Sequence, residues 1–245
     1  MHLHYTHAAQ SFGSDSSSEG GDLNAHPVAF IVGGTSGLGL ELALKLASSH
    51  SVIVTGRRDP KNSQVTFQNL DLSSISSLLN DLDRLLILLP KVDLFIYAAG
   101  FYQEGRINEL SDEESFTMIN VGLLAPALLL QRLLKKQSTL AGFIAVTSSS
   151  QVTPRLLEPI YTAVKAGLGM LANSVSLDEH VGKVLVAAPA GMQTRFWENR
   201  ERDISTMLDP MWVAEQILEH YARNFEYQLI RMSREPAKVD VVEVR

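Results

Sequence analysis

The sequence predicts an α/β fold in which helices cover both faces of a doubly wound parallel sheet. From Pro27 onward, short apolar runs rich in β-branched residues alternate with helical patterns. Most of these runs lack alternating polar residues, as expected for strands buried on both faces. No internal repeat and no linker rich in Pro and Gly follows residue 27, so residues 27–245 are expected to form one domain.

The strands and helices follow one another in the order that such a sheet requires. Buried strands are expected at residues 28–32, 51–55, 93–97, 142–147 and 183–188. Residues 65–70 have the pattern of a half-buried strand, and residues 227–232 supply another strand near the end. Helical patterns occupy residues 38–48, 74–89, 111–136, 161–179 and 210–222. Strands and helices that alternate at these lengths indicate right-handed βαβ units and therefore a parallel sheet.

The first 26 residues differ in composition from the rest of the chain. They are rich in Ser and Gly, and their three charged residues are all acidic. Such a segment cannot bury enough apolar surface to offset the entropy lost on ordering, so it is expected to be a disordered tail. Its histidines His2, His4 and His7 have no Cys or clustered carboxylates beside them. No metal site is therefore expected there.

Composition and net charge indicate which kinds of binding partner this protein is expected to lack. Apolar residues make up 45% of the chain and charged residues 20%, which are ordinary values for a folded domain. The formal net charge of −6 argues against a nucleic acid or an anionic membrane as the main partner. The chain has no Cys, and its longest apolar runs are much shorter than the ~18 residues of a membrane span. With no secretory signal pattern, a cytoplasmic protein is expected.

A glycine-rich turn joins the first predicted strand to the first predicted helix. Gly33, Gly34, Gly37 and Gly39 fall within "IVGGTSGLGLEL", with the spacing G-x-x-x-G-x-G. At this place in a doubly wound sheet, a pyrophosphate can lie against main-chain N–H groups at the positive end of the helix. A tight turn with a purely structural role is the alternative. Its position between a buried strand and a helix favours dinucleotide binding.

The end of the second predicted strand indicates which dinucleotide is bound. An acidic residue there accepts hydrogen bonds from a ribose 2′-hydroxyl, whereas an arginine accommodates a 2′-phosphate. This chain has "TGRRDP", with Arg57 and Arg58 before the first carboxylate, Asp59. The two arginines could also be ordinary solvated charges. Their place at the carboxyl end of the strand favours phosphate pairing, mainly by Arg57, so NADP is expected rather than NAD.

A second cluster of reactive side chains lies near the fourth helical pattern. Tyr161 and Lys165 are four residues apart, so they lie on the same face of a helix. This spacing alone could describe an ordinary pair on a helix surface. The serine run Ser148–Ser150, which leaves the strand at 142–147, strengthens the catalytic interpretation because such sheets bind ligands at strand ends. A nearby ammonium group would favour the phenolate and lower the tyrosine pKa.

Taken together, these motifs resemble those of the short-chain dehydrogenase/reductase family. The resemblance extends from about residue 28 to residue 232. The segments that carry it are "GGTSGLG", "TGR", the Asp71–Leu72 pair, "AAG" at 98–100, "NVG" at 120–122, the serine run, "YTAVK" and "PAGMQT" at 189–194. The resemblance implies a Rossmann-like sheet and hydride transfer between a nicotinamide cofactor and a small-molecule alcohol or carbonyl.

The resemblance also implies roles for individual side chains. Tyr161 would be the general acid and base, Lys165 would hold the nicotinamide ribose and tune Tyr161, and Asn120 would support a proton-relay water. A serine would polarise the substrate carbonyl. Counting forward from the strand favours Ser149, whereas the commonest family spacing to the tyrosine favours Ser148; we choose Ser149.

The expected cofactor-binding set combines the glycine turn with the other matching segments. Within it, Asp71 would lie at the adenine and Thr194 near the nicotinamide amide. The full set is Gly33, Thr35, Ser36, Gly37, Leu38, Gly39, Arg57, Arg58, Asp71, Leu72, Ala98, Ala99, Gly100, Tyr161, Lys165, Pro189 and Thr194.

Four departures from the family pattern leave a second hypothesis open. Val32 replaces the usual threonine, Tyr97–Ala98 replaces an Asn-Asn pair, and Ala190 replaces a glycine. The link between residues 55 and 65 is also too short for the usual helix. The main hypothesis is an NADP(H)-dependent oxidoreductase; the alternative is a nucleotide-binding regulatory or scaffolding protein without catalysis.

Two further expectations concern surfaces. Phe196 and Trp197 follow the last matching segment and could line a substrate pocket or simply fill the core. The apolar helix segments at 123–134 and 166–175 are of the kind that packs between subunits in such folds, so a homodimer or homotetramer is expected.

Overall fold

The computed structural model describes residues 26–198 and 201–245, so the predicted tail lies outside the described residues except for His26. Its strands are β1 (Val28–Val32), β2 (Ser51–Gly56), β3 (Thr66–Asn69), β4 (Leu94–Tyr97), β5 (Leu140–Val146), β6 (Val181–Pro189), β7 (Tyr227–Arg234) and β8 (Ala237–Val244). The α-helices are α1 (Gly37–Leu46), α2 (Ile75–Leu88), α3 (Asp112–Ile119), α4 (Ala125–Gln137), α5 (Pro159–Val175) and α6 (Pro210–Tyr221). Three short helical turns are η1 (Asn120–Leu124), η2 (Ser149–Gln151) and η3 (Arg195–Trp197).

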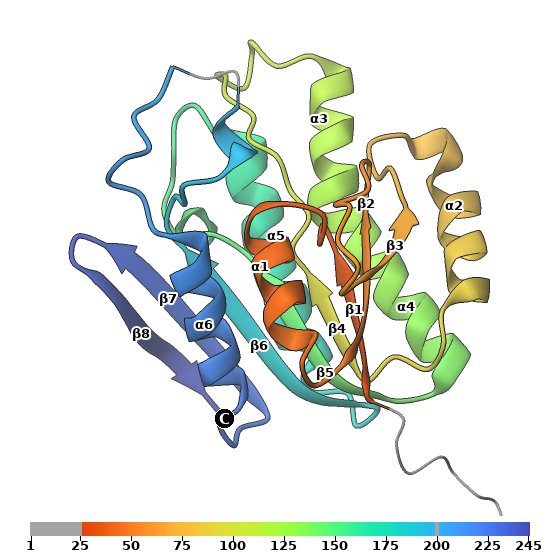
Figure 1. The fold of residues 1–245 in the computed structure, drawn as a ribbon. Helices are drawn as coiled ribbons and strands as arrows, with labels where there is room; N and C mark the ends of the chain where they lie inside the picture. Colours follow the sequence, from red (N-terminus) through yellow and green to blue (C-terminus); the bar gives the residue numbers. More distant parts are fainter. Residues whose placement is uncertain (1–25, 199–200) are drawn as a thin grey trace, which may run out of the picture.

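All eight strands form one sheet in the order β3-β2-β1-β4-β5-β6-β7-β8 (Figure 1). The chain winds outward from β1 in both directions, and β1 pairs in parallel with β2 and β4 on its two sides. The register places Ile31 opposite Val54 on one side and Ile96 on the other. The prediction of a doubly wound α/β sheet is therefore confirmed.

Two apolar cores hold the helices against opposite faces of this sheet. On one face, Leu42 of α1 and Ile217 of α6 pack with Ile31. On the other face, Leu82, Leu129 and Leu168 of α2, α4 and α5 join the second cluster. Burying one such side chain contributes about 1.5–3 kcal/mol to folding stability. Strands that are apolar on both faces gain this stabilisation on both sides only when helices cover both faces of the sheet.

The sheet differs from the prediction at its last strand. β8 runs antiparallel to β7 and forms the sheet edge, with Val241 and Val244 half exposed. The sequence "AKVDVVEV" mixes charged and apolar residues, so it lacks the continuous apolar run that identified the central strands. A charged, exposed edge strand of this kind is stabilised by its hairpin partner more than by its own pattern.

The predicted helix at 111–136 is divided into three parts. Ser111 and Glu114 form a capping box at the start of α3. A π-helical turn, η1, then separates α3 from α4, and the Ala125 N–H donates to the carbonyl of Asn120 five residues earlier. The segment Asp112–Gln137 has the length and apolar composition of a membrane span, but half of its most apolar window is buried inside the fold.

The motif-bearing segments meet at one edge of the sheet. β1, β2, β4, β5 and β6 are mutually parallel, so their carboxyl ends lie at the same edge. Nine residues, 57–65, link β2 to β3 without a helix, as their length predicts. The glycine turn, the arginines, the "AAG" segment and the serine run therefore converge, as expected for ligand binding in such sheets.

Candidate active site

The glycine turn is shaped first by close packing within the protein. Gly33 has a φ of +81°, and a Cβ there would lie 2.6 Å from the main chain of Ala99. A Cβ on Gly39 would lie 2.1 Å from the carbonyl oxygen of Gly33. The N–H groups of Gly33 and Gly34 donate to the carbonyl of Thr55 at 3.0 and 3.1 Å. These glycines are therefore required by the turn itself.

The start of α1 nevertheless fits a bound phosphate. Ser36 is the N-cap residue, and its side chain makes no capping hydrogen bond; the first turn also contains no acidic residue. Gly37 has a φ of +52°, and a Cβ built on it would lie 3.3 Å from the Thr194 side chain. The first N–H groups of α1 and the positive end of its dipole therefore remain available to an anion.

The end of β2 presents two exposed cations. In the described part of the chain, no carboxylate lies within ion-pair distance of Arg57 or Arg58. Thr35 packs against the end of β2: a Cβ built on Gly56 would lie 2.3 Å from the Oγ1 atom of Thr35. Arg57 is therefore free to pair with a phosphate at this position.

In the segment after β3, the Asp71 carboxylate already has hydrogen-bond partners within the protein. The Asp71 carboxylate accepts hydrogen bonds from the N–H and the hydroxyl of Ser73 at 2.9 and 2.7 Å. Burial raises the pKa of the Asp71 carboxyl, but these bonds and the charge of Arg57 outweigh it and leave the pKa lowered. Leu72 and Leu38 are buried in the two cores, so only their main chains remain for a ligand.

The predicted catalytic pair, Tyr161 and Lys165, lies on α5 and faces the sheet. Tyr161 and Lys165 are 8% and 5% exposed. The Lys165 Nζ donates to the carbonyl of Val146 at 3.1 Å, and it lies 5.8 Å from the centre of the Tyr161 ring. It also lies 3.5 Å from a Cβ built on Gly100, which places it beside the end of β4.

The structure brings Ser148, and not the preferred Ser149, to Tyr161. The Ser148 side chain interacts with the Tyr161 hydroxyl and acts to lower its pKa. Ser148 has extended backbone and caps η2, accepting from the N–H of Ser150 at 3.1 Å. Ser149 is the first residue of that 3₁₀ turn, so the chain has already changed direction when it reaches Ser149.

Burial shifts the pKa values of both Tyr161 and Lys165. It raises the pKa of Tyr161 to about 12, although the Ser148 side chain acts in the opposite direction. Burial also lowers the pKa of Lys165 to about 8. The sequence suggested that the ammonium would lower the tyrosine pKa, but burial has the larger effect here. Tyr161 is therefore protonated at neutral pH and is suited to donate a proton.

Asn120 brings a buried amide into the same region. It is 1% exposed, and its Nδ2 atom has no hydrogen-bond partner among the described residues. Its π-turn packs directly on α5, because a Cβ on Gly122 would lie 2.4 Å from the Val164 side chain. A buried donor without a protein partner fits a bridging water.

The strand β6 brings the last predicted cofactor-binding residues to the same edge. Pro189 is the final residue of β6 and is buried. Thr194 caps η3, and its Oγ1 atom accepts from the N–H of Phe196 at 3.3 Å. Ala98 continues the sheet, with its N–H donating to the Val32 carbonyl at 2.9 Å.

An aromatic cluster packs around Tyr161. The rings of Tyr102 and Phe196 lie 6.3 and 6.1 Å from the Tyr161 ring, and Trp197 packs on both of them. The guanidinium of Arg202 lies 4.7 Å from the centre of the Trp197 ring and 5.2 Å from that of Tyr102. Phe196 therefore contacts the Tyr161 ring directly, and Trp197 packs on Phe196.

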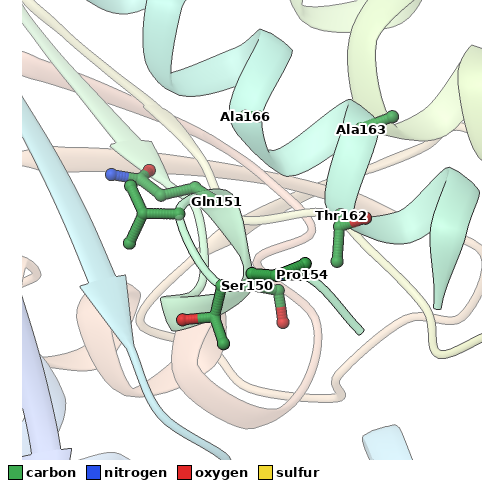
Figure 2. A pocket seen from close by; sticks show the side chains of 8 residues that line it. Ser150, Gln151, Pro154, Thr162, Ala163 and Ala166 are labelled. Atoms are coloured by element: carbon green, nitrogen blue, oxygen red, sulfur yellow. The ribbon is translucent and has the colours of Figure 1, made fainter. Parts of the chain in front are cut away.

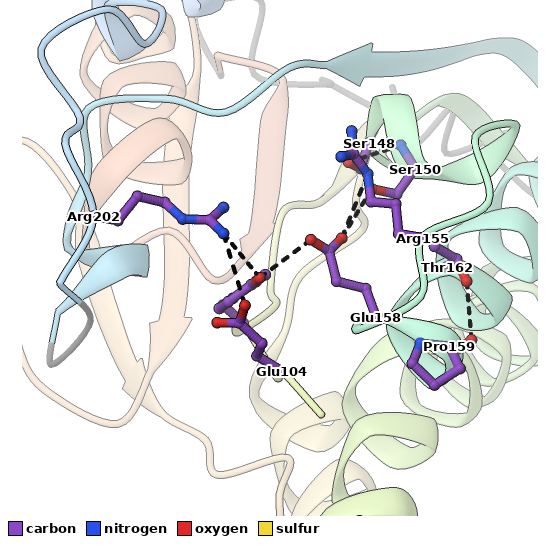
Figure 3. A network of polar contacts seen from close by, with 9 residues as sticks. Glu104, Ser148, Ser150, Arg155, Glu158, Pro159, Thr162 and Arg202 are labelled. Atoms are coloured by element: carbon purple, nitrogen blue, oxygen red, sulfur yellow. Dashed lines mark hydrogen bonds and ion pairs between the residues drawn. The ribbon is translucent and has the colours of Figure 1, made fainter. Parts of the chain in front are cut away.

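A polar network adjoins this cluster (Figure 3). Glu158 accepts from the Tyr102 hydroxyl at 3.1 Å and forms an ion pair with Arg155 at 3.6 Å. Arg202 approaches Glu104 at 3.9 Å. Tyr102, Glu158 and Arg202 are not among the site residues that the sequence predicts. Only the closeness of Glu158 to Tyr161 along the chain could have indicated one of them.

A separate cavity of about 300 Å³ lies on another face of α5 (Figure 2). It is lined by Ser150, Gln151 and Pro154 and by Thr162, Ala163 and Ala166 of the helix. Tyr161 and Lys165 project from a different face of α5 and do not line this cavity.

Comparison with known proteins agrees with this geometry. The family model described as short chain dehydrogenase matches residues 27–205. The chain belongs to the short-chain dehydrogenase/reductase family. It is therefore an oxidoreductase of that family, as the sequence motifs predict. No curated protein is similar enough in sequence to count as a match.

Solved structures of the short-chain dehydrogenase/reductase family share the fold. A short-chain dehydrogenase from Streptomyces avermitilis has a TM-score of 0.74 and 19% identity, with 87% of this chain and 90% of that chain covered. A short-chain dehydrogenase/reductase from Vibrio parahaemolyticus has a TM-score of 0.69 and 25% identity, with 83% and 98% covered. A Sphingobium yanoikuyae short-chain dehydrogenase in complex with NADPH has a TM-score of 0.71 and 20% identity, with 84% and 87% covered.

Proposed function

We propose that this protein interconverts an alcohol and a carbonyl compound with NADP(H) as the cofactor. The observation that carries the proposal is that Tyr161 and Lys165 are buried side by side on α5, with the Ser148 side chain acting on the Tyr161 hydroxyl. These groups lie at the carboxyl edge of the sheet, close to the glycine turn. A phenol and an ammonium buried together are costly for stability, and such groups are typical of catalytic sites.

The side chains divide the proton chemistry of carbonyl reduction among them. The Ser148 hydroxyl hydrogen-bonds the substrate oxygen and holds it beside the Tyr161 hydroxyl. Tyr161, protonated at neutral pH, donates its proton to that oxygen as negative charge develops there. The nicotinamide cofactor, when bound, supplies or accepts the hydride. The unpartnered Asn120 amide holds a water through which the proton is replaced.

Lys165 has a binding role and an electrostatic role. Its ammonium group has three donors, and the hydrogen bond to the Val146 carbonyl uses one of them. The other two are available to the hydroxyls of a nicotinamide ribose bound beside Gly100. The Nζ atom lies next to this residue, because a Cβ built on Gly100 would be 3.5 Å from it. Its positive charge also stabilises the phenolate that remains after proton transfer.

The preference for NADP over NAD is supported by the cations at the end of β2. Arg57 is exposed and lies at the position where such folds bind a 2′-phosphate. Among structural neighbours, the Sphingobium yanoikuyae protein is a complex with NADPH, and actinorhodin polyketide ketoreductase is also described with NADPH. Both resemble this chain in fold at 20% identity or less, so the main support is Arg57 itself.

A non-catalytic nucleotide-binding protein is the second candidate. It is favoured by the departures at Tyr97, Ala98 and Ala190, because each changes the surroundings of the cofactor site. The buried set of Ser148, Tyr161 and Lys165 argues against it, since binding a nucleotide does not require a protonated phenol beside a serine hydroxyl.

The test combines binding with turnover. NADPH and NADH are titrated in parallel by calorimetry, and NADPH oxidation is then followed with a panel of aldehydes and ketones. Tyr161→Phe should lose turnover by about 100-fold to 10,000-fold while its NADPH affinity stays within a few-fold. Tyr221→Phe, which removes a phenol oxygen packed against Gly142, is the matched control and should remain active.

Three outcomes separate the candidates. Tight NADPH binding with turnover that depends on Tyr161 supports the proposal. Tight binding without turnover across the panel favours the non-catalytic candidate. Full activity in Tyr161→Phe contradicts the role given to that residue.

A further inference from the structure

Tyr97 is an unusual residue at the end of β4. It is 0% exposed, and its hydroxyl donates a hydrogen bond to the main-chain carbonyl of Val121 in the π-turn η1. Burial alone raises its pKa far above the ordinary value, so the group stays a neutral donor. This side chain therefore ties the strand that ends beside Gly100 to the turn that contains Asn120.

The Val121 carbonyl needs this donor because the helix cannot supply one. In an α-helix the carbonyl would accept from the N–H four residues later, which belongs to Ala125. That N–H donates instead to the carbonyl of Asn120. The next residue, Pro126, has no N–H at all. The Tyr97 hydroxyl thus satisfies a buried carbonyl that would otherwise have no partner.

The same hydrogen bond selects between two registers of the helix. In the α register, the Ala125 N–H would return to Val121 and the extra residue of the π-turn would be removed. That change would rotate the preceding segment, including Asn120, by about 100° relative to α4. The phenol of Tyr97 favours the π register because only there does the Val121 carbonyl lack a main-chain donor.

We infer that Tyr97 is a positioning residue, whose hydroxyl holds the π-turn in the register that sets Asn120 beside α5. The turn lies against α5 through Gly122, whose built Cβ would meet Val164 at 2.4 Å. Val164 lies directly before Lys165 in the chain. The inference rests on the proposed function, because the effect on turnover requires the Asn120 amide to take part in proton relay.

Tyr97→Phe tests the inference with two independent readouts. The first is hydrogen exchange of the Ala125 amide, which should become at least 10-fold faster when the π register loses its extra donor. The second is steady-state kinetics. The kcat for carbonyl reduction should fall about 10-fold while KM for NADPH and carbonyl stays within about two-fold to three-fold, because the change acts on proton relay and not on binding. The pH profile of kcat should also change shape.

A second variant restores the missing donor. Pro126→Ala supplies an N–H five residues after Val121, where the π register can use it. Combined with Tyr97→Phe, it should recover most of the lost kcat and the slow exchange at Ala125. The matched control is Tyr221→Phe, which removes a phenol oxygen packed against Gly142 from a partly buried side chain and should leave both readouts unchanged.

The outcomes distinguish this inference from the proposed function. Unchanged exchange at Ala125 in Tyr97→Phe overturns the inference whatever the activity. A loss of kcat that Pro126→Ala does not restore also overturns it, because the loss then arises elsewhere. If the wild-type protein turns over no carbonyl, the proposed function fails; faster Ala125 exchange in Tyr97→Phe would still support the π-register role of Tyr97.

Discussion

Replacing Lys165 by methionine should stabilise the protein while removing its activity. Lys165 is 5% exposed, and within the described ranges no carboxylate forms an ion pair with it. Burial lowers its pKa from 10.5 to about 8. At about 1.4 kcal/mol per tenfold change in proton affinity, the charged form is disfavoured in the folded protein by roughly 3 kcal/mol.

The expected net gain is smaller than this penalty. Methionine has a similar length and fills the same space without a charge. It leaves the Val146 carbonyl without the Lys165 donor, which costs about 1–3 kcal/mol. The free energy of unfolding of Lys165→Met at pH 7 should therefore exceed that of the wild type by up to about 2 kcal/mol, with a rise in Tm of up to several degrees.

The difference between the two proteins should depend on pH in a defined direction. Below pH 8, Lys165 is charged in both the folded and unfolded states, so the wild type bears the full penalty. Between pH 8 and 10.5 the folded protein releases the proton while the unfolded chain still binds it, so wild-type stability rises relative to the variant. Carbonyl reduction by the wild type should fall over the same range, as the ammonium beside Tyr161 loses its charge.

Urea unfolding, followed by tryptophan fluorescence at pH 7 and pH 10, measures this directly. The advantage of Lys165→Met should be present at pH 7 and should be lost or reversed at pH 10, because the wild type gains about 2.5 kcal/mol over this range. A variant that is less stable than the wild type at pH 7, or a difference that does not change with pH, would refute the conclusion that burial of the charge dominates at this position.

Three further predictions concern the glycine turn, the arginine at the end of β2 and the serine run. Gly39→Ala places a Cβ 2.1 Å from a main-chain oxygen of its own turn, so the variant should lose at least about 3 kcal/mol of unfolding free energy or fail to fold; a normal urea curve would contradict this. Arg57→Ala should weaken NADPH binding about 10-fold or more in calorimetry and leave NADH binding unchanged; equal losses for both would remove the 2′-phosphate argument. Ser148→Ala should lower kcat at least about 10-fold, whereas Ser149→Ala should lower it much less, and the reverse order would restore Ser149 as the catalytic serine.

The central fold could be predicted from the sequence because its signals are local. Buried strands such as 28–32 and 142–147 are apolar without alternation, and the glycines between β1 and α1 mark the turn unambiguously. β8 was missed because it is an exposed edge strand whose pairing with β7 depends on the hairpin. The pattern of its residues alone does not distinguish it from a polar loop.

The missed parts of the site depend on contacts between distant segments. The division of the long helix at Asn120 is set by the hydroxyl of Tyr97 and the missing N–H of Pro126, which no helical pattern reveals. Tyr102 reaches Tyr161 only through the folded chain. The two candidate serines differ by one residue, and the 3₁₀ turn at the strand end decides which of them meets the tyrosine.

The most direct test of the central claim is to follow the hydride itself. The protein is incubated with a carbonyl panel and NADPH that carries deuterium at the transferring position of the nicotinamide ring, and the alcohols formed are analysed by mass spectrometry. Our account predicts alcohols that contain one deuterium with the wild-type protein, and only background amounts with Tyr161→Phe. NADPH binding without any deuterated alcohol from the wild-type protein would contradict the claim that this chain is a reductase.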